Sequence, residues 1–301
     1  MEIRLLRYFI ALADYQTVSR AAKNLHISQP TLSRQLSELE ENLGVQLFIR
    51  GNRRISLTNE GMYLLSKARE IVSLTEKTEA NFKNSAENIS GEIHVGSGES
   101  DVMKIIAQSV KNITEKHNDI RFHLYSGNAE DIFEKLESGL LDFGIIVDPL
   151  VDKRYYDYLQ LPLEEKWGVL MHKDSDLANK RKRFILPEDL LNQPLILSQK
   201  SVSYNELSGW FGSNIKDLNI RCTCNLIYNA AKMVEANVGY AICLDKLIDA
   251  YDTTKLNFRP LYPNLTATLY LIWKKHQVLS KASTTFLKQL RRDIEKYHII
   301  D

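Results

Sequence analysis

The sequence predicts an α/β protein made of two unlike parts, an all-α N-terminal segment and a longer C-terminal domain built around a parallel sheet. Three observations support this. Apolar residues recur at helical spacing through the first 43 residues. A long helical pattern follows, from about 58 to 88, and from Gly91 onward strand and helix patterns alternate. The length of 301 residues exceeds that of most single domains, which also favours separate cores.

Composition narrows the class of protein. Hydrophobic residues make up 44% and charged residues 26% of the chain, as in ordinary globular proteins. No stretch reaches the roughly 18 consecutive apolar residues of a membrane span, so a cytoplasmic protein without a membrane partner is expected. The three cysteines, Cys222, Cys224 and Cys243, are too few for a disulfide framework and suit a reducing compartment.

Charge is unevenly distributed along the chain. Residues 1–58 carry eight basic and five acidic residues, a net charge of +3, whereas the whole chain is only +1. A basic N-terminal segment favours a nucleic-acid partner there, although three charges are a weak signal.

The first 43 residues predict three short helices. Leu5 and Phe9 belong to the first helix, and a second begins at Thr17. The third begins at Ser28, a residue type that caps helices, and ends at Gly44. Pro30 lies in its first turn, where a missing N–H costs little.

One face of the third helix is apolar, with leucines spaced by 4, 3 and 4 residues: Leu32, Leu36, Leu39 and Leu43. This stripe is expected to pack on the first two helices. Only His26 and Ile27 separate the second helix from the Ser28 cap, a connection typical of a helix-turn-helix. The opposite face of the third helix should then point outward.

Residues 45–57 predict a hairpin, with apolar arms at 47–49 and 55–57 around a Gly51-Asn52 turn. Thr58 then caps the long helix. Along this helix, residues spaced by 3 and 4 form a seam that favours pairing with a second copy: Leu65, Ala68, Val72, Thr75, Glu79, Phe82 and Ala86. Packing on its own domain is an equally good interpretation for the first half of the seam.

The remainder has βαβαβ order, which implies a mostly parallel sheet. The predicted elements are strands at 92–96, 121–125 and 142–147, with helices at 102–115 and 129–138 between them. Further strands are expected at 161–171, 194–198, 220–227, 240–243 and 268–274, with helices at 229–237 and 280–297.

The motifs of residues 17–61 closely resemble those of the LysR-type transcriptional regulators. They combine, in order, Ala21-Ala22, Ser28-Gln29-Pro30, Leu43-Gly44, Leu47-Phe48-Ile49-Arg50 and Leu57-Thr58-Asn59-Glu60-Gly61. Two later segments, at 138–145 and 238–242, are similar to those of the same family. In the second segment the family often has two glycines, whereas only Gly239 is present here.

This resemblance implies a complete architecture. It consists of a winged helix-turn-helix at 1–58, a linker and dimerisation helix at 59–90, and a two-lobed, periplasmic-binding-protein-like α/β effector domain at 91–301. Lobe I would comprise 91–162 and 267–301, and lobe II 163–266, with crossings near 161–165 and 265–268. The implied partners are double-stranded promoter DNA, a small-molecule effector, further copies in a homodimer or homotetramer, and RNA polymerase.

The candidate DNA-binding residues begin the third helix and occupy the hairpin tip. In the helix they are Ser28, Gln29, Pro30, Thr31, Ser33 and Arg34, and in the hairpin Arg50, Arg53 and Arg54. Glutamine can pair with adenine, and arginine with guanine or phosphate, from a helix in the major groove. Taken singly, Ser28 could be only a cap, and the others a solvated surface.

The candidate effector-binding residues follow the carboxyl ends of predicted strands, where sheets of this type bind ligands: Gly98, Glu99, Ser100, Tyr125, Gly127, Asn128, Ser198, Ser201 and Gly239. Each could instead be a turn residue. Glu99 would repel an anion unless Lys104 or Lys200 balances it, which leaves a cationic, amphoteric or sugar-like effector open.

Other functions lack the required motifs. The segment after Gly96 is neither a dinucleotide fingerprint nor a nucleophile elbow, so no cofactor and no enzymatic activity are expected. The histidines show no ligand spacing near the cysteines, and no metal site is expected. Cys222 and Cys224 fit one face of a strand better than a redox switch. A small-molecule receptor without a transcriptional role is the alternative that the C-terminal part alone would suit.

Overall fold

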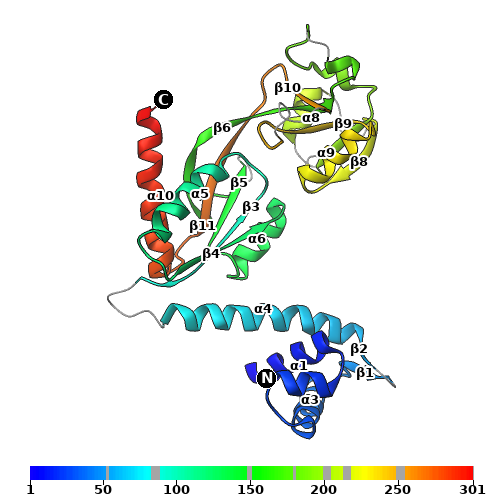
Figure 1. The fold of residues 1–301 in the computed structure, drawn as a ribbon, viewed down its shortest axis with the longest axis vertical. Coiled ribbons are helices and arrows are strands. Elements are labelled where there is room, and N and C mark those ends of the chain that lie inside the picture. Colours follow the sequence, from blue (N-terminus) through cyan, green and yellow to red (C-terminus); the bar gives the residue numbers. More distant parts are fainter. Residues whose placement is uncertain are drawn as a thin grey trace. The chain divides into compact units, whose positions relative to one another are not determined.

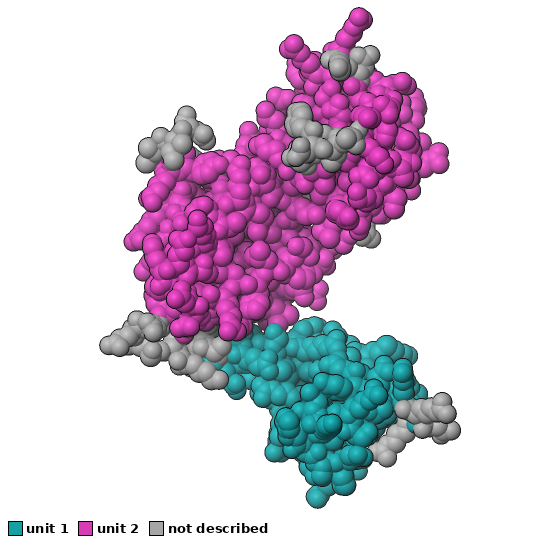
Figure 2. Space-filling model, viewed as in Figure 1, with its two compact units in different colours: residues 1–84 teal, residues 85–301 magenta. Residues whose placement is uncertain are grey.

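The computed structural model describes residues 1–51, 54–82, 89–147, 151–178, 181–198, 205–212, 218–248 and 255–300. It contains two compact units, Met1–Asn84 and Ser85–Asp301, coloured separately in Figure 2. The predicted site residues Arg53 and Ser201 lie outside the described residues, as do Ala86 of the seam, Asn52 of the turn and the side chain of Arg50.

The first unit is a helical domain with a small hairpin (Figure 1). Its elements are α1 (Ile3–Tyr15), α2 (Val18–Asn24), α3 (Gln29–Leu43), β1 (Phe48–Arg50), β2 (Ile55–Leu57) and α4 (Asn59–Phe82). The two strands pair antiparallel, with Phe48 opposite Leu57. The winged helix-turn-helix predicted from the sequence is confirmed.

The leucine stripe of α3 supplies much of the core of this unit. Leu32, Leu36 and Leu39 are at most 1% exposed and pack with Phe9 and Leu12 of α1. Leu43 is 39% exposed, so the expectation that it joins the stripe is wrong. Leu43 is the last residue before Gly44, which ends the helix in the left-handed conformation at φ 68°. Residue spacing shows which face is apolar but not how far the neighbouring helices extend.

The joint between the hairpin and α4 requires a glycine. The Thr58 hydroxyl accepts a hydrogen bond from the Gly61 N–H at 3.0 Å and donates one to the Gln46 carbonyl at 2.7 Å. A Cβ atom at Gly61 would lie 2.0 Å from the Leu47 carbonyl oxygen. The backbones therefore approach more closely than any side chain permits.

The second unit is built on a mixed sheet whose strand order is β4-β3-β5-β11-β6-β9-β7-β8, with β10 also paired to β6. In chain order the strands are β3 (Gly91–Ser97), β4 (Ile120–Ser126), β5 (Phe143–Val147), β6 (Tyr156–His172), β7 (Leu195–Ser198), β8 (Ile220–Cys224), β9 (Tyr240–Leu244), β10 (Leu256–Pro260) and β11 (Thr266–Lys274). The predicted parallel pairing of the first three strands is present.

Helices cover this sheet in two separate groups. Beside β3, β4 and β5 lie α5 (Met103–Thr114), α6 (Ala129–Glu137) and α10 (Lys281–Ile300), and the core there includes Phe143 and Phe286. The other group comprises η1 (Asp176–Ala178), α7 (Pro187–Leu190), α8 (Asn205–Phe211) and α9 (Ile227–Glu235). The hydrophobic clusters beneath this second group of helices are separate from the cluster that contains Phe143 and Phe286. The unit therefore has two lobes, the α/β architecture expected from the resemblance.

Strand β6 belongs to both lobes, as Figure 1 shows. It pairs with β11 from Tyr156 to Lys166, and with β9 and β10 from Trp167 to His172. The sequence predicted a strand only over 161–171, and the structure extends it at its amino end. The chain passes between lobes at Lys166 on β6 and returns just before Thr266 on β11.

Candidate functional sites

The amino end of α3 presents a polar, solvent-facing surface. The Ser28 hydroxyl accepts a hydrogen bond from the Thr31 N–H at 3.3 Å and lies 2.8 Å from the Thr31 hydroxyl oxygen. Gln29, Pro30 and Arg34 are exposed, whereas Ser33 is half-buried. Because leucines on the opposite side hold the helix to the core, these exposed side chains are free to contact a partner.

Contacts with Gln16, at the end of α1, hold one arm of the hairpin. Arg54 is exposed, and its guanidinium donates a hydrogen bond to the Gln16 side-chain oxygen at 3.4 Å. The Ile55 N–H donates to the Gln16 carbonyl at 2.9 Å. Arg54 therefore lies on a hairpin that is tied to the end of α1.

Sequence reasoning missed the role of Glu40 on α3. One carboxylate oxygen accepts hydrogen bonds from the Leu47 N–H at 2.7 Å and the Phe48 N–H at 3.3 Å. These bonds fix the start of the hairpin relative to α3. Nothing in the spacing of Glu40 distinguishes it from the neighbouring surface glutamates.

A cavity of about 180 Å³ lies between the lobes of the second unit. Six predicted effector-site residues line it: Gly98, Glu99, Ser100, Gly127, Asn128 and Ser198. These residues lie at or just after the carboxyl ends of three strands, β3, β4 and β7, and the fold brings those ends together, as expected from the sequence. The Asn128 side chain also accepts a hydrogen bond from the Asp131 N–H at 3.1 Å, so it caps α6 as well.

Two other predicted residues lie elsewhere. Tyr125 borders an adjoining depression that Ser126 and Leu247 also line, and its ring lies under the Lys135 ammonium. Gly239 precedes β9, at the opposite end of the strand from the cleft-lining Leu244. A Cβ atom there would lie 2.3 Å from the Pro194 carbonyl oxygen, so Gly239 permits a close backbone approach instead of contacting the cleft.

Glu99 connects the two lobes. It follows β3 in one lobe, and its carboxylate accepts a hydrogen bond from the N–H of Ile227, the first residue of α9 in the other lobe. A carboxylate is favoured there by the free amide groups and dipole of the helix. A second link across the lobes is the ion pair between Asp101 and Lys246, at 3.8 Å.

A buried carboxyl group, Glu165, lies on β6 at the crossing between lobes and was not predicted. One of its oxygens accepts hydrogen bonds from the Ser100 hydroxyl at 2.5 Å and from the Val102 N–H at 2.9 Å. The side chain is buried, and its other oxygen has no hydrogen-bond partner. Burial therefore raises the pKa of Glu165 above its ordinary value.

The rest of the cleft lining is largely apolar, a property that strand-end reasoning did not identify. It includes Ile145, Val147, Trp167, Leu226 and Leu265 from both lobes. Cys224 also lines it, with its Sγ 3.7 Å from that of Cys222. Burial raises the pKa of the Cys224 thiol, and that of Cys243 to about 12, so both thiols are protonated near neutral pH.

Within the described part of the chain, no helix has the length and apolar character needed to cross a membrane. An exposed helix-turn-helix joined to a two-lobed α/β unit with an apolar cleft defines a class of protein, the DNA-binding regulators that carry a substrate-binding domain.

Comparison with known proteins gives the family. The chain matches the model of the bacterial regulatory helix-turn-helix protein, lysR family, over residues 3–62 and that of the LysR substrate binding domain over residues 86–295. The HTH-type transcriptional regulator BsdA of Bacillus subtilis (strain 168) is 29% identical over 293 residues, 95% of this chain and 99% of that protein. The Hca operon transcriptional activator HcaR of Escherichia coli (strain K12) is 27% identical over 283 residues, 92% of this chain and 93% of that protein.

Solved structures share the fold. The crystal structure of full-length CbnR complexed with its target DNA has a TM-score of 0.74 at 22% identity, over 97% of this chain and 100% of that one. The chain belongs to the LysR family of transcription regulators. It is accordingly a DNA-binding transcription regulator and not an enzyme.

Proposed function

We propose that this regulator inserts the amino end of α3 into the major groove of promoter DNA. The observation that carries the proposal is the exposure of Gln29, Pro30 and Arg34 on a helix whose opposite face is buried. Gln29 and Arg34 would contact base edges, and the Ser28–Thr31 cap would approach a phosphate. The wing arginines Arg50, Arg53 and Arg54 would contact the DNA backbone or the minor groove.

Gel shifts with the DNA upstream of the regulator's own gene test this proposal. Gln29→Ala and Arg34→Ala are each expected to weaken specific binding by about 1–3 kcal/mol and to relax sequence preference. Arg183→Ala is the matched control, because this arginine is also exposed but belongs to the second unit. Unchanged specific binding by both α3 variants at physiological salt would contradict the groove assignment.

We further propose that a small-molecule effector binds in the cleft between the lobes. The support is a cavity lined by both lobes, mostly by apolar side chains with a few polar groups among them. Closure of the lobes would be the bistable element that connects effector binding to DNA binding.

The position of Glu99 bears on the class of effector. Its carboxylate already accepts the amide hydrogen of Ile227 at the start of α9, so an anionic effector would have to displace it. A cationic, amphoteric or sugar-like effector could bind beside it. Calorimetric titration should use a panel of amines, amino acids, sugars and carboxylates. Wild-type binding of carboxylates alone would contradict the proposal, and Glu99→Gln is expected to weaken the binding of a cation.

Assembly belongs to the same proposal. We infer a homodimer or homotetramer, in which α4 contacts a second copy, and a contact with RNA polymerase when bound to DNA. Apolar side chains left exposed on α4 support the first inference: Met62, Tyr63, Ile71 and Leu74. The receptor without a transcriptional role is not retained, because the helix-turn-helix family match covers residues 3–62.

A further inference from the structure

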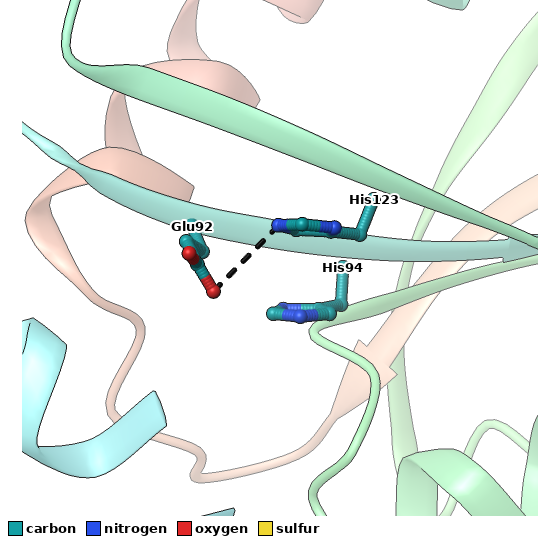
Figure 3. A group of neighbouring side chains, drawn as sticks. All are labelled: Glu92, His94 and His123. Carbon is teal, nitrogen blue, oxygen red and sulfur yellow. Dashed lines mark ion pairs between the residues drawn. The ribbon is translucent and has the colours of Figure 1, made fainter. Parts of the chain in front are cut away.

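Three potential metal-ligating side chains meet on one face of the sheet, at its β4 edge (Figure 3). Glu92 and His94 lie two residues apart on β3, so both point to the same side of the strand. His123 lies on β4, directly opposite His94 in the parallel register. Strand pairing alone therefore brings two imidazoles and one carboxylate together.

The three side chains lie close together, although their ligand atoms do not yet point at one common position. The rings of His94 and His123 are stacked, with centroids 4.6 Å apart and planes at 15°. The Glu92 carboxylate lies 3.6 Å from His123 Nε2, the contact drawn as a dashed line in Figure 3. One ligand atom from each residue lies within 4.8 Å of the others.

His94 is additionally placed by a buried carboxylate. The Asp142 carboxylate accepts a hydrogen bond from the backbone N–H of His94 at 2.8 Å. The same carboxylate lies 3.7 Å from Nδ1 of the His94 side chain. Nδ1 is buried and has no hydrogen-bond partner. A metal-bound histidine commonly donates its other ring N–H to a carboxylate, which orients the ring and increases its basicity. With Nε2 of His94 as the ligand atom, Asp142 would be the nearby carboxylate for Nδ1, although the two groups are not hydrogen-bonded here.

The structure also shows how the ligands could close on an ion. Metal–nitrogen bonds of about 2.0–2.1 Å require ligand atoms closer together than those seen here. The side chains that must rotate are the more exposed ones, His123 at 49% and Glu92 at 39%, whereas His94 is 21% exposed. The site therefore has one anchored ligand and two adjustable ligands.

We propose that Glu92, His94 and His123 form a site for a divalent transition-metal ion. Two imidazole nitrogens and one carboxylate oxygen suit Zn²⁺, Co²⁺, Ni²⁺ or Cu²⁺ and disfavour Ca²⁺ and Mg²⁺, which prefer all-oxygen ligands. The remaining coordination positions are left for water. The bound ion cross-links β3 to the edge strand β4. None of the three residues lines the inter-lobe cavity, so this site is separate from the proposed effector site.

This site contradicts the expectation from the sequence that no metal is bound, and no local pattern predicts it. The ligand pair His94 and His123 has no motif spacing. Only the register of β3 against β4 places these residues side by side.

Titration of the untagged, metal-free full chain with Zn²⁺ and Co²⁺ tests the site. A Cys222→Ser, Cys224→Ser background removes the adjacent thiols of β8, which could bind the same ions elsewhere in the chain. One ion per chain is expected by calorimetry, with Co²⁺ giving visible absorption bands and Ca²⁺ not competing. His123→Ala and Glu92→Gln are each expected to weaken Zn²⁺ binding at least about 10-fold, and Asp142→Asn is expected to weaken it less.

His276→Asn is the matched control, since this histidine is exposed and its φ of 63° is one that asparagine tolerates. Its Zn²⁺ affinity should equal that of the parent. Circular dichroism confirms that each variant is folded. The proposal is overturned if the parent shows no saturable Zn²⁺ binding, or if His123→Ala binds Zn²⁺ as tightly as His276→Asn. The titration uses neither DNA nor effector, so its outcome is independent of the proposed function.

Discussion

Ser28, Leu32 and Arg34 belong to the same helix and perform three different tasks. Ser28 satisfies a free N–H at the start of α3, Leu32 is fully buried, and Arg34 is exposed. Ser28 caps the helix because it immediately precedes the first helical residue, Gln29. Leu32 and Arg34 are two positions apart on the helix and therefore point in different directions. These assignments were predictable from the sequence.

Leu32 and Leu43 provide a matched pair for testing the apolar stripe. Leu32→Ala is expected to destabilise the first unit by about 2–5 kcal/mol, because it leaves a cavity in a packed core. Leu43→Ala should cost less than about 1 kcal/mol, since 39% of Leu43 is already exposed. Urea unfolding followed by circular dichroism measures both. Equal losses of stability would show that Leu43 packs in solution.

Glu165 gives a pH-dependent prediction. Because burial raises the pKa of Glu165 above 4.5, the folded protein binds this proton more tightly than the unfolded chain does. The free energy of unfolding should therefore fall as pH rises from about 4.5 through the raised folded value. Glu165→Gln has no such proton to lose, so its stability relative to wild type should increase as pH rises from about 4.5 through the raised folded pKa of Glu165.

Chemical unfolding of both proteins at several pH values measures this difference. Glu164→Gln, a change at the exposed neighbour of Glu165, is the control and should leave the pH dependence of stability unchanged. If Glu165→Gln follows the wild-type pH dependence throughout, the buried carboxyl does not bind its proton as inferred.

The joint between the hairpin and α4 is determined by contacts between secondary-structure elements. Gly61 lies against the Leu47 carbonyl, and the Glu40 carboxylate binds the Leu47 and Phe48 amides on the same turn of chain. The hairpin is therefore positioned by α3 and α4 together. The sequence predicted the hairpin and the Thr58 cap, but it did not predict these contacts between elements.

Gly61→Ala tests this joint. The added methyl group would meet the Leu47 carbonyl oxygen at 2.0 Å, so we expect a loss of about 1–3 kcal/mol and weaker DNA binding. Gly209→Ala is the matched control. It lies in α8, with nothing within 4 Å of an added Cβ, and should be neutral or stabilising by up to about 1 kcal/mol. Thermal unfolding and gel shifts measure both. A neutral Gly61→Ala would contradict the close approach.

At the scale of the whole molecule, the first half of the seam expected on α4 lies against its own unit. Ala68 and Val72 are buried in the core of their own unit, which supports the intradomain interpretation of those positions. The apolar residues that remain exposed, Tyr63 and Leu74 among them, lie on another side of the helix. The residue spacing correctly predicted apolar positions along α4. It could not show whether each apolar face packs on its own unit or contacts a second copy.

Leu74→Glu tests the proposed assembly. A charge introduced into a buried apolar contact between copies should raise the dimer dissociation constant by at least about 10-fold, or about 1.4 kcal/mol. Ser73→Glu, at the neighbouring exposed position, is the control for charge alone. Sedimentation analysis across a concentration series measures both. If Leu74→Glu assembles as wild type does, this face of α4 is not the contact.

By itself, the sequence determined the helix-turn-helix, its Ser28 cap, most of the strands and helices in their order, and the general position of the cleft. It did not predict β10, α7 or α8. These features depend on residues that are near one another in the chain, where spacing, capping and turn chemistry act locally. Tertiary structure decided the contacts between distant residues. Strand register placed His94 beside His123, lobe packing brought Glu99 to Ile227, and the strand crossing buried Glu165. Pairing and burial of this kind depend on the whole fold, because no local pattern specifies which remote side chain will be adjacent.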